Sequence, residues 1–125
     1  MRRTAAVLAL LAALLVAAPP AGATPRGCGD TSNGQLCVDG PFPVAGLYCA
    51  SYWRTRTAGE IRPRLGYQLG LKNSDSVDVR RWWGSKATRN GYVRLCGHVA
   101  GKSVETCIRS VMSYKGAIYA SKWRC

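Results

Sequence analysis

Six cysteines limit what this chain can fold into more than any other feature of its sequence. They are Cys28, Cys37, Cys49, Cys96, Cys107 and Cys125. An even number of cysteines in a short exported chain is typical of a disulfide framework. The sequence has no Cys-x-x-Cys pair and one histidine, His98. We therefore expect three disulfides, and neither a metal site nor a dithiol redox motif.

The N-terminal segment predicts export. Two arginines at positions 2 and 3 precede an apolar run over residues 5–18, and Ala21-Gly22-Ala23 supplies the small residues that a signal peptidase accepts. This is the pattern of a secretory signal over residues 1–23. The run is shorter than the roughly 20 apolar residues of a membrane span. We therefore expect a secreted, extracellular protein with no membrane span, whose cysteines meet an oxidising environment.

Sequence alone leaves fifteen cysteine pairings open. Local spacing favours one of them. Cys28 and Cys37 flank a turn-rich stretch, and Cys49 and Cys96 lie in two strand-like runs. Cys107 begins the segment that leads to Cys125, the last residue. Cys28–Cys37, Cys49–Cys96 and Cys107–Cys125 are therefore the favoured pairs.

The residues after the signal are typical of short strands. Residues 45–55 are rich in aromatic side chains, and apolar and polar residues alternate over 61–71. Residues 76–83 begin with the same alternation, which predicts that Val77 and Val79 point inward. Two turn signals, at Asn90-Gly91 and Lys115-Gly116, lie between strand-like runs.

Residues 103–113 fit two structures. Apolar residues at helical spacing favour a short helix capped by Ser103, whereas the β-branched residues and the following hairpin signal favour a strand. The fold expected is all-β, a small disulfide-stabilised β-sandwich or barrel, with one short helix near 103–113 as the alternative. The predicted organisation is a signal over 1–23, an N-terminal arm or loop over 24–43, and a β domain over 44–125.

Basic and aromatic residues occupy the same stretches of a chain with a formal net charge of +12. Arginine binds carboxylate and phosphate groups through paired hydrogen bonds, and tryptophan and arginine are enriched at binding hot spots. The candidate binding residues are Trp53, Arg54, Arg56, Arg62, Arg64, Arg80, Arg81, Trp82 and Trp83. In the alternative interpretation the arginines are ordinary solvated surface, and Trp53 and one of Trp82 and Trp83 fill the core.

The residues favour a binding protein over an enzyme. A small ribonuclease would need Glu60 or Glu105 to work with His98, but no recognisable signature surrounds these residues. The sequence has no Gly-x-Ser-x-Gly motif for serine hydrolysis. We expect no cofactor, and a partner that is another protein or an anionic cell-envelope surface; nucleic acid is not the expected partner of an exported chain.

Short motifs carry two resemblances. Gly27-Cys28-Gly29, the stretch over 34–40 and Leu65-Gly66-Tyr67 resemble a group of small secreted actinobacterial proteins, mostly without known function. A further comparison is with the adaptor subunits of secreted umbrella toxin particles, which implies a role in antibacterial antagonism. Trp53-Arg54 is similar to the Trp-Arg-Tyr loop of secreted α-amylase inhibitors, although Thr55 stands in place of the tyrosine. An enzyme inhibitor, a basic ribonuclease and a toxin therefore remain the alternatives to an adaptor.

Overall fold

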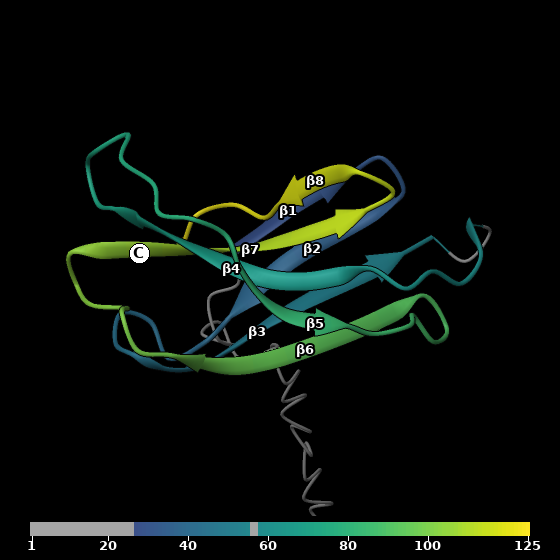
Figure 1. Ribbon diagram of the computed structural model, residues 1–125, viewed down its shortest axis with the longest axis horizontal. Helices are drawn as coiled ribbons and strands as arrows, with labels where there is room; N and C mark the ends of the chain where they lie inside the picture. The colour runs from purple at the N-terminus through teal and green to yellow at the C-terminus, as the bar shows by residue number, and fades with distance from the viewer. Residues whose placement is uncertain (1–26, 56–57) are drawn as a thin grey trace, which may run out of the picture.

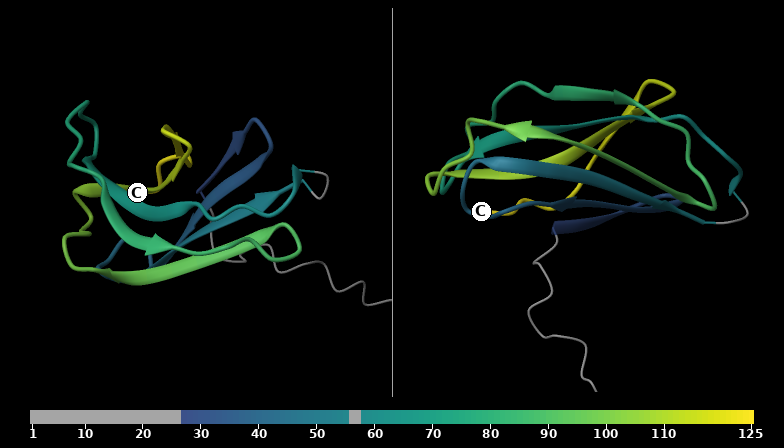
Figure 2. Two further views of the ribbon diagram at one scale, coloured as in Figure 1. Left: turned by 45° about the vertical axis from the view of Figure 1, so that its right-hand side comes forward. Right: turned by 90° about the horizontal axis from the view of Figure 1, so that it is seen from below.

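Two four-stranded antiparallel sheets pack face to face in the computed structural model, which describes residues 27–55 and 58–125 (Figures 1 and 2). The predicted signal lies outside the described residues. The first sheet has the order β1-β2-β3-β6, and the second has the order β5-β4-β7-β8. The strands of the first sheet are β1 (Gly27–Thr31), β2 (Gly34–Asp39), β3 (Gly46–Arg54) and β6 (Tyr92–Val99). Those of the second are β4 (Arg64–Leu71), β5 (Arg81–Ser85), β7 (Thr106–Tyr114) and β8 (Ala117–Ala120).

The core lies between the sheets and forms two apolar clusters. Tyr52 belongs to one cluster and Tyr48 to the other, and both side chains are buried. Trp83, on the edge strand β5, packs against both clusters. A polar contact also joins the sheets, because the buried Ser110 hydroxyl donates to the carbonyl of Cys37 at 2.9 Å. The expected all-β sandwich is thus confirmed.

Both predicted turns are present. Asn90 and Gly91 have φ values of 52° and 76°, and Lys115 and Gly116 have values of 49° and 77°. Two consecutive residues at positive φ are the geometry of the type I′ turn, which suits the twist of antiparallel strands. The second turn pairs Tyr114 with Ala117 and so builds the β7–β8 hairpin.

The three favoured disulfides are the ones that form. Cys28 pairs with Cys37 between neighbouring strands β1 and β2, and Cys49 pairs with Cys96 between β3 and β6. Cys107 of β7 is joined to Cys125, at the end of a C-terminal segment that itself pairs with β7 through Ile108 and Arg124. Three disulfides fit an oxidising environment.

Three expectations from the sequence are corrected. The N-terminal arm or loop expected over 24–43 is wrong for residues 27–39, which form β1 and β2. The helix alternative near 103–113 is also wrong, because β7 occupies most of that stretch and pairs with β4 over eight residues. Val77 and Val79 do not point inward; they are 53% and 66% exposed, in a connection before β5 whose residues 72–80 are all exposed.

Glycines explain why β1 forms from so turn-like a sequence. Gly27 and Gly29 face the C-terminal segment, whose backbone lies so near that a Cβ on Gly29 would come within 3.2 Å of the Ala120 carbonyl oxygen. A Cβ on Gly27 would approach the Lys122 carbonyl oxygen to 2.9 Å. Absent side chains on one face of β1 therefore allow the end of the chain to close this side of the sandwich (Figure 1).

A buried lysine joins three segments at one end of the sandwich. The Lys102 Nζ donates to the carbonyls of Pro43, Ser103 and Cys125 at 3.1, 2.7 and 3.2 Å. Its side chain is 3% exposed. Burial, followed by the positive charge of Lys72, lowers the pKa of Lys102.

Replacing Lys102 with methionine should lower the free energy of unfolding by about 1–3 kcal/mol, because three oxygen acceptors lose their donor. Chemical denaturation of the oxidised protein measures this loss. Lys72→Met is the matched control, since Lys72 is exposed, and it should change the free energy by less than about 0.5 kcal/mol. Equal stability of the two variants would contradict a bridging role for Lys102.

Candidate functional site

The outer side of the second sheet gathers arginine and tryptophan side chains from several segments. We call this surface the arginine–tryptophan face. It consists of Arg62, Arg64, Arg80, Trp82, Arg109 and Trp123. Strand register places these residues together, because Gly66 pairs with Trp82 on one side of β4 and Gln68 pairs with Arg109 on the other.

Arg64 and Trp82 form the first part of the face. Burial alternates from Ile61 to Leu65, so Arg62 and Arg64 are exposed on one side of the chain. The guanidinium of Arg64 lies 4.7 Å from the centre of the Trp82 ring. This cation–π contact holds the guanidinium over the ring while its N–H groups can still donate to a ligand.

A polar network around Gln68 forms the second part. Gln68 is 6% exposed. Its amide nitrogen donates to the carbonyl of Asp78 at 2.8 Å, and its amide oxygen accepts from the Arg109 Nε and Nη2 at 3.0 and 2.7 Å. Arg109 in turn lies 4.3 Å from the ring centre of Trp123. The network therefore fixes the position of Arg109 relative to the connection that leads into β5.

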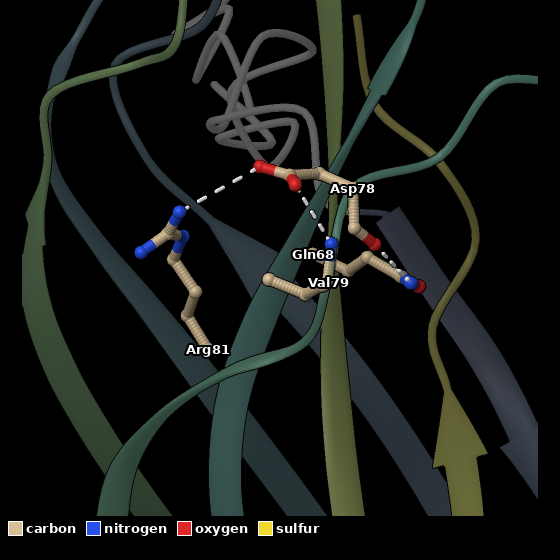
Figure 3. A network of polar contacts seen from close by, with 4 residues as sticks. All are labelled: Gln68, Asp78, Val79 and Arg81. Atoms are coloured by element: carbon tan, nitrogen blue, oxygen red, sulfur yellow. Dashed lines mark hydrogen bonds and ion pairs between the residues drawn. The ribbon is translucent and has the colours of Figure 1, made fainter.

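Asp78 organises that connection (Figure 3). Its carboxylate accepts from the backbone N–H of Val79 at 2.8 Å and lies 3.9 Å from a guanidinium nitrogen of Arg81. Its carbonyl holds Gln68, as described above. The segment that carries Arg80 is thereby attached to β4 through Gln68.

Positive charge accumulates on this face. Burial, followed by the positive charge of Arg80, lowers the pKa of Arg109. The guanidinium groups of Arg80 and Arg109 therefore lie close enough for their positive charges to repel one another. A negatively charged partner would relieve this repulsion, so the arrangement is suited to an anion.

Two predicted binding residues lie elsewhere. Trp53 is 46% exposed on the outer side of the first sheet, so the alternative interpretation that places it in the core is wrong, and it stacks on Tyr92 with ring centres 4.1 Å apart. Arg54 is used internally, because its guanidinium donates to the carbonyls of Ala58 and Gly59 at 2.8 and 2.9 Å. Arg54 therefore stabilises a loop, and its Nε and Nη2 donors are already used within the chain.

The remaining predicted residues divide between surface, edge and core. Trp83 points inward, as one of the two adjacent tryptophans was expected to do, and so it is not part of the face. Arg81 lies at the edge beside Asp78. Arg56 lies outside the described residues. Arg62, Arg64, Arg80 and Trp82 are thus the predicted residues that the fold brings together.

No family model, curated protein or solved structure matches this chain. Its chemistry must therefore be inferred from its own geometry. Within residues 27–55 and 58–125, no three His, Cys, Asp or Glu side chains are grouped closely enough to hold a metal ion. In the same part of the chain, no helix has the length and apolar character needed to cross a membrane.

Glu60 and His98, one pair considered in the ribonuclease alternative, lie near opposite ends of β6. Glu60 lines a small hollow with Asn90 and Gly91, next to the start of β6. His98 lies near the other end of β6, six residues after Tyr92, a distance of about 20 Å along a strand. Glu105 precedes β7, and no hydrogen bond or ion pair between described residues joins it to His98.

Two members of the face were not among the predicted site residues. Arg109 lies in the stretch whose helix and strand interpretations competed, and only the strand interpretation places it opposite Ile108. Trp123 stands between Lys122 and Arg124, so a basic–aromatic cluster at the end of the chain was a usable signal. Its packing against Arg109 depends on the pairing of the C-terminal segment with β7.

Proposed function

We propose that this chain is a secreted, non-enzymatic binding protein that uses the arginine–tryptophan face to hold an acidic protein partner. The observation that carries this proposal is the stacking of Arg64 on Trp82 and of Arg109 on Trp123 on one side of one sheet. Prepositioned guanidinium groups lose less side-chain entropy when they bind carboxylates. Tryptophan and arginine are also the residues that most often dominate protein interfaces.

The rest of the molecule supports a scaffold for binding. Cross-linked strands and the Gln68 network hold the side chains of the face in place, which is what a preorganised interface needs. Export is inferred from the N-terminal sequence and agrees with the three disulfides. The resemblance to adaptor subunits of secreted toxin complexes extends the proposal to a role in joining larger secreted chains.

A charge-reversal experiment tests the proposal. Arg64→Glu combined with Arg80→Glu should weaken capture of the partner from culture supernatant at least about tenfold, because two attractive contacts become repulsive. The control, Arg89→Glu with Lys115→Glu, makes the same change in net charge at two exposed positions that are not members of the face. It should change capture by less than about twofold.

Two results would refute the proposal. One is equal capture by the face variant and the control, which would place the interface elsewhere. The other is a protein that binds polyphosphate or polyglutamate beads but captures no partner protein, and whose bead binding falls equally in the face variant and in the control. That result would mean that net charge, and not this face, attracts anionic polymers.

A further inference from the structure

The Cys49–Cys96 disulfide lies on the outer side of the first sheet and exposes one of its two residues. Cys49 and Cys96 are directly opposite one another in the β3–β6 register, with Cα atoms 4.0 Å apart. Cys49 is 4% exposed, whereas Cys96 is exposed. An external thiolate can therefore reach Cys96 far more easily than Cys49.

A cation contacts the buried sulfur. Arg94 lies two residues before Cys96 on the same side of β6, and its Nη2 is 3.2 Å from the Cys49 Sγ. A neighbouring guanidinium stabilises a thiolate, and a stabilised thiolate is a better leaving group in thiol–disulfide exchange. Cys96 therefore carries the sulfur that an external thiolate can reach, and Cys49 carries the sulfur that leaves more readily as a thiolate.

The other two disulfides lack this arrangement. The Cys37 sulfur lies 3.8 Å from the amide oxygen of Gln35, which would not stabilise a negative charge. Among the described residues, no cationic side chain donates to a sulfur of Cys28–Cys37 or of Cys107–Cys125. The contact with Arg94 therefore distinguishes one bond from two otherwise similar ones.

We propose that Cys49–Cys96 is a thiol–disulfide exchange site, opened by a dithiol reductant that attacks Cys96 while Arg94 stabilises the departing Cys49 thiolate. The incoming thiolate forms a new S–S bond with Cys96, and the electron pair of the broken bond passes to Cys49. The second thiol of the reductant, as a thiolate, then displaces the Cys96 thiolate and closes the oxidised reductant. The protein disulfide gains two electrons, and the dithiol loses two.

Opening this bond would remove the covalent cross-link between β6 and β3. β6 is an edge strand of the first sheet and is hydrogen-bonded to β3 on one side. With the disulfide reduced, backbone pairing and the inward side chains of β6 alone would hold it. The inference is independent of the arginine–tryptophan face, which belongs to the other sheet.

Limited reduction tests the proposal. The folded protein is treated with substoichiometric dithiothreitol at pH 7, quenched with N-ethylmaleimide and mapped by mass spectrometry. Cys49 and Cys96 should be labelled first. With glutathione, a single thiol, the mixed disulfide should form on Cys96 and not on Cys49.

Variants of Arg94 separate the chemical role from simple exposure. Arg94→Gln should slow reduction of this bond about three- to tenfold, and Arg94→Lys should restore part of the rate. Arg89→Gln, at an exposed position near the start of the same strand, should leave the rate unchanged. Earlier opening of another disulfide, a glutathione adduct on Cys49, or an unchanged or faster rate in Arg94→Gln would each overturn the proposal.

Discussion

Replacing Trp83 with alanine is expected to lower the free energy of unfolding by about 3–5 kcal/mol, the range for removing a large aromatic side chain from a core. Trp83 packs against both core clusters and stacks on Tyr67, with ring centres 5.2 Å apart. Its indole also covers Gly97 of β6, where a Cβ would come within 2.2 Å of the Nε1 atom. The ring therefore fills the space between the edge strands β5 and β6, and alanine would leave a cavity there.

The adjacent Trp82 is the matched control. It faces outward and contacts Arg64, so its replacement with alanine should cost only about 0.5–1 kcal/mol in stability. Chemical denaturation of the two variants under oxidising conditions compares these losses. Trp82→Ala should nevertheless weaken partner capture, whereas a Trp83→Ala variant that is still folded should weaken it less. Equal losses of stability would contradict the assignment of Trp83 to the core and of Trp82 to the arginine–tryptophan face.

Replacing Gly66 with alanine is expected to cost about 3 kcal/mol and to remove partner capture as well, because overpacking against backbone forces strands apart. A Cβ at this position would lie 2.0 Å from the Arg81 carbonyl oxygen and 2.8 Å from the Trp82 Cα. Both are backbone atoms, so no side-chain rotation relieves the clash. β5 would have to move away from β4, and Trp82 would leave Arg64.

Gly70 provides the comparison on the same strand and the same face. An added Cβ there would meet mainly the Trp123 ring, at 3.1 Å, which can tilt. Gly70→Ala should therefore cost less than about 1 kcal/mol. Thermal unfolding and capture assays on both variants distinguish these cases. A Gly66→Ala protein with normal stability and normal capture would contradict the described β4–β5 pairing.

Local sequence signals predicted much of this fold. The two I′ turns follow from residue pairs that tolerate positive φ, and the three disulfides follow from cysteines in runs that become neighbours. β1 was missed, because its glycines look like loop residues until the C-terminal segment, about 90 residues later, is placed against them. Alternation also predicted the wrong environment for Val77 and Val79. A period of two shows that the two faces of a segment differ in polarity, but it does not show whether another layer of the protein covers the apolar face.

The binding face shows the same limit. Arg64, Arg80 and Trp82 could be named from their clustering in sequence. Whether an arginine is free depends on tertiary contacts, and Arg54 was assigned to the surface although loop carbonyls occupy its guanidinium. Arg109 joins the face only through the pairing of β7 with β4. Strand register is a non-local property that spacing along one chain does not specify.

None of the three disulfides connects the two layers. Each one joins strands or segments that already lie side by side within a layer. Apart from the polypeptide itself, cohesion between the layers thus depends on non-covalent contacts such as the Trp83 packing and the Ser110 hydroxyl. Under mechanical load or in denaturant, the oxidised molecule can split along its midplane with every sulfur bridge intact, so survival of the bridges would not report on survival of the sandwich.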